Sequence, residues 1–152
     1  MIVERADFED PSLRELLQFH LACMHTYSPP EGVHALDLSG LQAPDMTLFV
    51  VRRDGRVAGM GGLKELDPAW GELKSMRTHP DYLRQGIAAA ILEHLIAEAR
   101  RRGYRRLSLE TGRTADFDPA LALYRRVGFT NSGPFADYAQ DAYSQFLYLE
   151  LI

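Results

Sequence analysis

The segment of residues 72–103 constrains the fold most, because it passes from a strand pattern to a helix pattern across a short turn. A short stretch that contains apolar residues predicts a strand over residues 70–78, and an amphipathic helix is predicted over about residues 85–102. The turn between them carries Arg84 and Gly86. The first backbone N–H groups of a helix have no partner within the helix, and the helix dipole favours negative charge beside them. We therefore expect this turn to hold a phosphate-bearing ligand.

Length and composition limit the classes of protein to consider. The chain has 152 residues, of which 46% are hydrophobic and 25% charged, as in one ordinary globular domain. The formal net charge of −4 argues against non-specific binding of nucleic acids, because domains that bind them are usually basic. No apolar stretch reaches the roughly 18 residues of a membrane-spanning helix, and no signal peptide is visible. A single cysteine, Cys23, excludes an internal disulfide and fits a reducing compartment. We expect one cytoplasmic domain over residues 1–152, with no membrane, nucleic acid or metal.

The spacing of apolar residues predicts alternating helices and strands without an internal repeat, and hence one mixed α/β domain. Strands are expected over residues 1–6, 47–53, 56–66, 70–78, 105–111, 129–132 and 145–151. Helices are expected from Asp10 to a break at Ser28, over residues 33–41 and 85–102, and from an Asp118 cap to Gly128. Three glycines in the strand of residues 56–66 predict a bulge, or a close approach by a ligand or another backbone. Cys23 falls in an apolar helical stretch, where a small buried side chain is favoured over a nucleophile.

Two motifs point to a family. The sequence ELKSMRTHP of residues 72–80, followed by Gly86-Ile87-Ala88, resembles motif A of the GCN5-related N-acetyltransferases, the GNAT family. That motif ends in a Gln/Arg-x-x-Gly-x-Gly/Ala turn. The sequence ALALYRRVGF of residues 120–129 resembles the Ala-x-x-Leu-Tyr-x-x-x-Gly-Phe segment of the same family. Both motifs stand in the family's order and spacing. The resemblance covers essentially the whole chain and implies a small bacterial type, with a mostly antiparallel sheet of six to seven strands and about four helices.

The resemblance implies a site for acetyl-CoA. Backbone amides of residues 83–88 would cradle the pyrophosphate, with Gly86 and Ala88 small enough for its approach. Leu83 occupies the family's first Gln/Arg position, and Arg84 beside it would supply the cation. Backbone groups of residues 76–78 would pair with the pantetheine arm. The residues expected to bind the cofactor are Met76, Arg77, Thr78, Leu83, Arg84, Gln85, Gly86, Ile87 and Ala88.

Tyr124 and Met76 are candidates for the acetyl transfer itself. Tyr124 matches the family tyrosine that can protonate the departing thiolate. The alternative is a helix core aromatic, but Gly128-Phe129 follow in register and favour the catalytic role. The Met76 N–H is expected to bind the acetyl carbonyl, where negative charge develops. Phe117 stands where the family often has an asparagine that contacts pantetheine, so no such contact is assigned.

Glu72 is the candidate general base, which would take the proton that the acceptor ammonium must lose. It lies four residues before Met76, so both side chains are expected on the same face of the strand. The alternative is an ordinary strand-end glutamate in water or paired with Lys74 or Arg77. The fallback bases are Glu65, Glu110 and His79, of which His79 is better explained as a turn residue before Pro80.

The acceptor site in this fold is usually built from the first two helices, the loop between them and the last strands. The residues expected to bind substrate are Glu31, His34, Lys74, Arg113 and Tyr138, among wider candidates that include Ser28, Pro29, Pro30, Phe135, Asp137 and Tyr143. The set of His34, Arg77 and Arg113 with aromatics would suit a small amine that also carries a carboxylate, such as an amino acid. Surface charges unconnected to any pocket would explain the same residues.

These observations predict an enzyme that transfers the acetyl group of acetyl-CoA to a primary amine by direct attack in a ternary complex. A non-catalytic acetyl-CoA-binding sensor is the alternative, although Tyr124 argues against it. A nucleotide-binding enzyme is disfavoured, because no Gly-x-x-x-x-Gly-Lys-Ser/Thr motif is present. The apolar stretch of residues 143–152 could pair across a homodimer or form an inner strand.

Overall fold

The computed structural model describes residues 1–30 and 35–151, and it contains a seven-stranded sheet in the order β1-β2-β3-β4-β5-β7-β6. The strands are β1 (Val3–Arg5), β2 (Met46–Arg53), β3 (Arg56–Asp67), β4 (Trp70–Thr78), β5 (Arg106–Gly112), β6 (Thr130–Ser132) and β7 (Ser144–Glu150). The α-helices in this part of the chain are α1 (Pro11–Tyr27), α2 (Leu38–Leu41), α3 (Ile87–Arg101) and α4 (Asp118–Arg126). All neighbouring strands are antiparallel except β4 and β5. The predicted mostly antiparallel α/β fold is confirmed.

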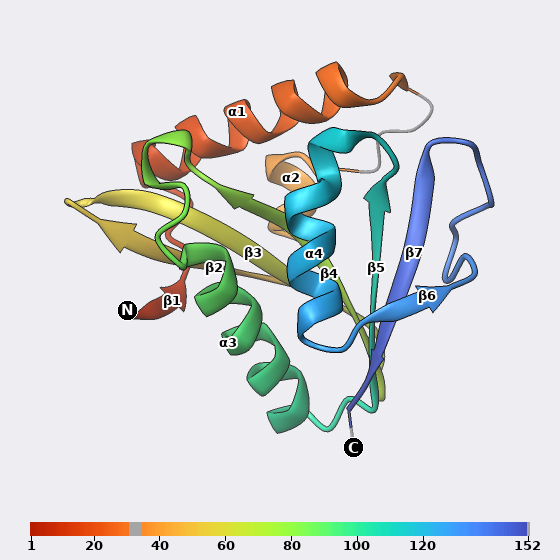
Figure 1. Ribbon diagram of the computed structural model, residues 1–152. Helices are drawn as coiled ribbons and strands as arrows, with labels where there is room; N and C mark the ends of the chain where they lie inside the picture. The colour runs from red at the N-terminus through yellow and green to blue at the C-terminus, as the bar shows by residue number, and fades with distance from the viewer. Residues whose placement is uncertain (31–34, 152) are drawn as a thin grey trace.

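Helices cover the sheet on both faces, with α3 and α4 on one face and α1 and α2 on the other (Figure 1). The apolar side chains of β2 pack alternately against the helices on the two faces of the sheet. Phe49 and Val51 join the apolar cluster beneath α3 and α4, whereas Leu48 and Val50 join the cluster beneath α1 and α2. Successive side chains of a strand point to opposite faces, so a strand of unbroken apolar residues fits a sheet that is buried on both sides.

Gly59 and Gly61 of β3 lie directly beneath α3. A β-carbon at Gly59 would stand 2.5 Å from the Ile87 side chain, and one at Gly61 would stand 2.5 Å from the Met76 sulfur. Because β-carbons do not approach other atoms so closely, these glycines allow the helix to pack tightly on the sheet. The close approach predicted from the glycines is therefore made by a helix, and the register of β3 against β4 also shifts here.

β4 and β5 are paired over only four residues each, Trp70–Leu73 and Arg106–Leu109. Beyond Leu73, β4 stays paired with β3 and β5 stays paired with β7, so a fork opens between the two parallel strands. Ser75 lies at this fork with a φ of 59°, which is unusual for a residue with a side chain. The register of β4 against β3 shifts at the same place, which marks a β-bulge.

Two helix boundaries differ from the prediction. The helix expected over residues 33–41 is shorter, and the first two residues of that range lie outside the described part of the chain. α2 starts after Asp37, whose carboxylate accepts a hydrogen bond from the Gly40 N–H at 2.9 Å and so caps the helix. Asp118 is the first residue of α4 and not its cap, because a 3-10 turn of residues 115–117 leads into the helix.

The C-terminal strand resolves an alternative that the sequence left open. β7 lies between β5 and β6 and is hydrogen-bonded to both. It is therefore an inner strand of this sheet.

Candidate active site

A cavity of about 140 Å³ lies at the fork between β4 and β5. Side chains of α1, both strands, α4 and the loop between β6 and β7 border it. Segments far apart in the sequence therefore meet at the place where the sheet divides. Nine residues named in the sequence analysis border this cavity: Ser28, Glu72, Lys74, Met76, Arg77, Glu110, Phe117, Tyr124 and Tyr138.

Tyr124 is buried on α4, with 6% of its surface exposed, and borders the cavity. Its ring packs edge-on against Phe129, with the ring centroids 5.7 Å apart, so the Gly-Phe pair after α4 holds it in place. Burial raises the pKa of Tyr124 above its ordinary value; the Arg77 charge opposes this rise and the Glu110 charge adds to it. The phenol therefore keeps its proton at neutral pH, as a proton donor must. Tyr124 is both a core aromatic and a cavity residue.

Glu72 is buried, with 2% of its surface exposed, and two donors hold one of its carboxylate oxygens. The Tyr138 hydroxyl donates to Glu72 Oε2 at 2.6 Å, and the Lys74 ammonium donates to the same oxygen at 3.2 Å. Lys74 also donates to the Tyr138 hydroxyl at 2.7 Å. Burial, followed by the charge of Glu72, raises the pKa of Tyr138. The expected pairing of Glu72 with Lys74 is present, but within a buried network and not at a solvated strand end.

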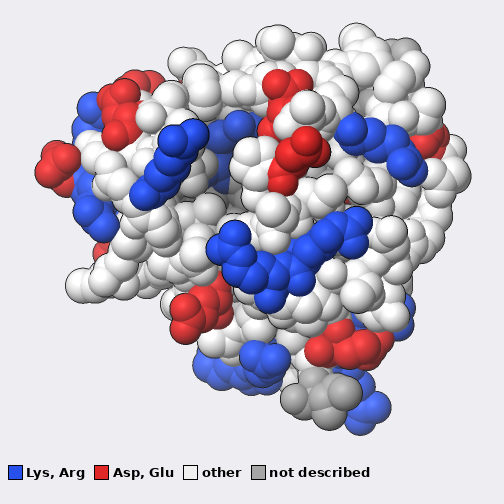
Figure 2. All heavy atoms as spheres, in the orientation of Figure 1, with Lys and Arg blue, Asp and Glu red and all other residues white. Residues whose placement is uncertain are grey.

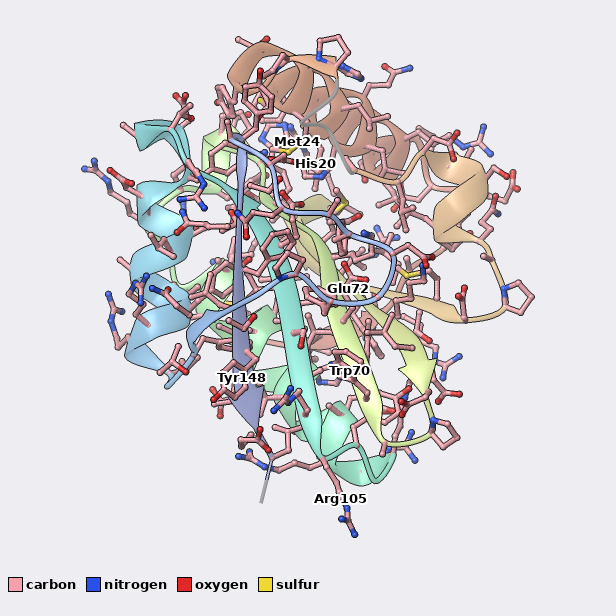
Figure 3. All side chains as sticks on the ribbon, turned by 90° about the vertical axis from the view of Figure 1, so that its right-hand side faces the viewer. His20, Met24, Trp70, Glu72, Arg105 and Tyr148 are labelled. Atoms are coloured by element: carbon pink, nitrogen blue, oxygen red, sulfur yellow. The ribbon has the colours of Figure 1, made fainter. Side chains whose placement is uncertain are left out.

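The loop between β6 and β7 brings Tyr138 to this network and crosses in front of Glu72 (Figure 3). Phe135 anchors the loop, since it is buried against Trp70, Tyr138 and Phe146 at ring distances of 5.9, 5.0 and 5.9 Å. A second, more open cavity of about 420 Å³ lies against the same loop, and Glu72 and Tyr138 border both cavities. The two side chains thus form the wall between an inner and an outer space.

The prediction that Glu72 and Met76 share a face of β4 is wrong. Met76 packs into the apolar cluster beneath α3, together with Leu73, whereas Glu72 contacts Lys74 on the opposite face. In a regular strand Leu73 and Met76 would face opposite ways, because side chains alternate. The bulge at Ser75 adds one residue and reverses the alternation. The Met76 side chain therefore belongs to the core, and its backbone remains at the fork.

The turn before α3 presents backbone donors. Gly86 precedes the helix in the left-handed conformation, with a φ of 78°, and no side chain caps the helix there. The start of α1 is different, because Asp10 accepts a hydrogen bond from the Ser12 N–H at 2.9 Å. Arg84 also has a positive φ of 61°, and residues 83–86 are exposed. An uncapped, exposed helix start fits a pyrophosphate, which is what the predicted cofactor residues require.

The face of the molecule that carries α3 and α4 has a basic region. Figure 2 shows a band of Lys and Arg side chains across the middle of this face. The last turn of α4 carries Arg125 and Arg126, and both are exposed. A local positive potential of this kind favours an anionic nucleotide even though the whole chain is acidic.

His20 borders the cavity and was not singled out from the sequence. It lies on α1 with 4% of its surface exposed, and Figure 3 shows it with Met24 on the side of the helix that faces the sheet. Its Nδ1 accepts a hydrogen bond from Arg77 Nε at 3.0 Å. Burial, followed by the Arg77 charge, lowers the pKa of His20 to about 3. The available signal was its position between Leu17 and Cys23 on the buried stripe of an amphipathic helix.

Three further residues were predicted to bind substrate. Glu31 and His34 fall outside the described residues. Arg113 is not among the cavity residues, and its Nε donates to the Ser144 carbonyl at 2.8 Å. Of the substrate candidates, the structure brings Lys74 and Tyr138 to the cavity, together with Ser28 of the wider set and Arg77.

The three fallback bases differ in their position relative to the cavity. Glu65 accepts a hydrogen bond from the Tyr104 hydroxyl at 2.8 Å and does not border the cavity. His79 caps a 3-10 turn through Nδ1, which accepts from the Asp81 N–H at 3.1 Å, as expected of a turn residue. Glu110 of β5 does border the cavity and is the carboxylate that rivals Glu72.

Phe117 forms an apolar part of the cavity wall. Its ring lies over Gly112, where a β-carbon would stand 2.1 Å from the ring, and it packs edge-on against Tyr27 with centroids 5.7 Å apart. The place where the family often has an asparagine is thus filled by an aromatic side chain that is held between β5 and α1.

Comparison with known proteins identifies the family. The model of the acetyltransferase (GNAT) family matches residues 13–129. The chain belongs to the GNAT family. YsnE of Bacillus subtilis (strain 168), an uncharacterized N-acetyltransferase, is 46% identical over 147 residues that cover 97% of each chain. YedL of Escherichia coli (strain K12), also an uncharacterized N-acetyltransferase, is 45% identical over 98% of this chain and 94% of its own. The IAA acetyltransferase of Azospirillum brasilense is 38% identical over 78% of this chain and 77% of its own.

Solved structures agree with this assignment. A protein of Klebsiella pneumoniae described as an acyl-CoA N-acyltransferase has a TM-score of 0.82 and 28% identity, covering 99% of this chain and 97% of its own. A GNAT acetyltransferase of Elizabethkingia anophelis shares the fold, with a TM-score of 0.70 and 18% identity over 99% of this chain and 97% of its own, and its structure contains acetyl-CoA. The GNAT protein described here is an N-acetyltransferase.

In the part of the chain that the structure describes, none of the helices combines the length and apolarity that crossing a bilayer requires. Within the same residues, no three histidine, cysteine or acidic side chains gather in a way that could hold a metal ion.

Proposed function

We propose that this GNAT enzyme transfers the acetyl group directly to the primary amine of a small molecule, with both substrates bound at once. The observation that carries the proposal is that Glu72 and Tyr124 border one cavity at the fork, together with Met76. Direct attack needs a base for the ammonium, a donor for the carbonyl oxygen and an acid for the leaving thiolate. The residues that could fill these three roles, Glu72, Met76 and Tyr124, border one cavity where β4 and β5 separate.

The residues would act in sequence. Glu72 takes a proton from the acceptor ammonium, directly or through water; its Oε1 has no hydrogen-bond partner among the described residues, while Oε2 is held by two donors. The amine nitrogen then forms a bond to the acetyl carbon, and the Met76 N–H stabilises the charge on the carbonyl oxygen. As the carbon–sulfur bond breaks, Tyr124 gives its hydroxyl proton to the departing thiolate and regains a proton from the nitrogen, which leaves a neutral amide.

The backbone supports the predicted position of the cofactor. Residues 74–78 of β4 have β3 on one side and lack β5 on the other, so their outward backbone groups can pair with an extended pantetheine arm. The uncapped N–H groups at the start of α3 would hold the pyrophosphate. The pantetheine arm and the pyrophosphate would then lie along the backbone between Thr78 of β4 and Arg84 of the turn before α3.

The size of the cavity supports a small acceptor. The cavity has a volume of about 140 Å³ and is bordered by α1, α4 and the loop that carries Tyr138. A space of this size favours a compact acceptor over a polypeptide, which needs an extended groove. The buried pair of Glu72 and Tyr138 separates this space from the second cavity.

The test is thiol release from acetyl-CoA with a panel of amino acids, polyamines, aminoglycosides and peptides. We expect at least one small primary amine to be acetylated. Tyr124→Phe should lower kcat by about 100-fold, because the thiolate then leaves without a positioned proton donor, while the KM for acetyl-CoA changes little. Turnover of peptides without turnover of any small amine would contradict the proposed acceptor class.

Tyr148→Phe provides the matched control for this experiment. Tyr148 lies on β7, away from the cavity, and its ring contacts the Arg106 guanidinium at 4.5 Å (Figure 3). This exchange also removes one phenolic hydroxyl, so it should leave kcat unchanged. Equal activity of Tyr124→Phe and Tyr148→Phe would remove Tyr124 from the mechanism.

A further inference from the structure

Arg77 borders the cavity with a charge that the described residues do not neutralise. No carboxylate among them forms an ion pair with Arg77, whereas the other cation of the cavity, Lys74, is paired with Glu72 at 3.2 Å. The contacts of the Arg77 guanidinium are with neutral groups: its Nε donates to His20 Nδ1, and it lies 5.9 Å from the Phe19 ring centroid. A partly buried guanidinium that has no carboxylate partner in the protein can form charge-assisted hydrogen bonds with an anionic ligand.

His20 adds a hydrogen-bond donor, and its contact with Arg77 determines which ring nitrogen carries the proton. An arginine Nε–H can only donate, so Nδ1 of His20 must accept, and in the neutral ring the proton is then on Nε2. The pKa of His20, lowered to about 3 by burial and by Arg77, keeps the ring neutral at ordinary pH. Nε2 has no hydrogen-bond partner among the described residues. His20 therefore offers an N–H to the cavity that it borders.

A third donor lies at the bulge. The Ser75 hydroxyl is buried without a hydrogen-bond partner among the described residues, and Ser75 borders the same cavity. An unpaired buried hydroxyl destabilises a protein unless a ligand or a water satisfies it. The Ser75 hydroxyl thus adds to the Arg77 guanidinium and His20 Nε2 as a polar group that borders the same small space.

Charges of the opposite sign lie close by. Glu110 and Glu72 also border the cavity, and the pKa of Tyr124 responds both to Arg77 and to Glu110, so positive and negative groups flank the reacting centre. A ligand with an ammonium and a carboxylate would match both signs. A simple amine would leave Arg77 and His20 without an acceptor.

We propose that Arg77 and His20 bind a carboxylate of the acceptor, so that the enzyme acetylates amino acids in preference to amines without an acid group. This inference rests on the proposed function of the same cavity. It assigns His20 and the Arg77 side chain to acceptor specificity, and it leaves the backbone of Arg77 to the cofactor.

The first experiment compares each amino acid of a panel with its own amide as acceptor. Wild type should prefer the acid by at least about tenfold in kcat/KM, as expected for charge-assisted hydrogen bonds. Arg77→Gln should abolish this preference by lowering kcat/KM for the acid only, with the KM for acetyl-CoA unchanged, and His20→Asn should reduce the preference in part. Arg105→Gln, at the far end of the molecule in Figure 3, is the control and should keep the preference. Equal use of acids and amides by wild type, or an equal loss for both in Arg77→Gln, would overturn the inference.

The second experiment does not depend on turnover. In protein labelled with ¹⁵N-histidine and saturated with CoA, the His20 Nε2 signal should shift when propionate is added and should not shift with propionamide. A shift with both probes, or with neither, would overturn the carboxylate site. Acetylation of amides and polyamines alone would sustain the proposed function and remove this inference, whereas absence of any amine turnover would remove the proposed function.

Discussion

The turn before α3 and the cavity around Glu72 lie on one molecule but are built in opposite ways. The turn is exposed and uses backbone groups, with positive φ angles at Arg84 and Gly86. The cavity is lined by buried and half-buried groups and uses side chains from α1, β4, β5, α4 and the loop between β6 and β7. A site made of backbone should tolerate side-chain changes, whereas a site made of paired buried side chains should not. The contrast implies that cofactor binding is a property of the fold and acceptor choice is a property of a few residues.

Glu72→Gln tests the side-chain site and has the largest expected effect. The amide cannot accept the acceptor's proton, so kcat should fall by about 10²- to 10⁴-fold in the thiol-release assay. Activity should recover as the pH is raised, because the amine then loses its proton without help. Lys74 also loses its counter-charge in the buried network, which should lower the free energy of unfolding by about 3–5 kcal/mol in denaturant titrations.

Glu110→Gln is the companion variant, because Glu110 is the other glutamate of the cavity. It should retain most of the activity. A loss of activity in Glu110→Gln, with Glu72→Gln active at neutral pH, would transfer the role of base to Glu110.

The pH dependence of stability tests whether the cavity wall holds a neutral histidine. Folding keeps the pKa of His20 at about 3, against 6.5 for an unperturbed histidine. Below pH 6.5 the unfolded chain binds a proton that the folded protein does not, so the free energy of unfolding should decrease as the pH falls. The decrease from this group is about 1.4 kcal/mol per pH unit, which is about tenfold in the unfolding equilibrium. Denaturant titrations between pH 5 and 8 measure it.

His20→Asn should flatten this dependence, and His25→Asn is the control. His25 lies on the same helix but is exposed, so its exchange should leave the slope as in wild type. Parallel curves for wild type and His20→Asn would show that His20 takes up its proton equally in both states.

How much of this could be predicted from the sequence depends on the same contrast. The turn before α3 was predictable, because a glycine just before an amphipathic helix indicates the backbone geometry of the turn from the local sequence alone. The pairing of Tyr124 with Phe129 was also accessible from the Tyr-x-x-x-Gly-Phe spacing. The bulge was not, since Ser75 has no feature that announces a positive φ. The contact of His20 with Arg77 joins residues 57 positions apart and exists only once α1 lies on the sheet.

Gly86→Ala tests the backbone site. Gly86 and Gly103 flank α3 with φ of 78° and 84°, and a β-carbon at either would meet no atom within 4 Å. Both exchanges should therefore destabilise the fold alike, by about 1–2 kcal/mol of conformational strain. Only Gly86→Ala should raise the KM for acetyl-CoA, by about tenfold, if a phosphate approaches the backbone there. An equal KM for the two variants would place the pyrophosphate elsewhere.

Arg84→Ala should have the smallest effect. The side chain is exposed, and a solvated charge contributes little, so the KM for acetyl-CoA should rise by at most about fivefold and less at high salt. A rise of 100-fold would mean that the arginine side chain, and not the backbone, holds the phosphates.

The short pairing of β4 with β5 has a further consequence for the sheet as a mechanical unit. Strands β1 to β4 form one antiparallel half and β5, β7 and β6 form another, and four residue pairs join the two halves at one end. The opposite end is open at the fork. A ligand that spans the fork would connect the halves at their free end, so that substrate binding would stiffen the sheet across the fork. The enzyme's rigidity would then be greatest when both of its substrates are in place.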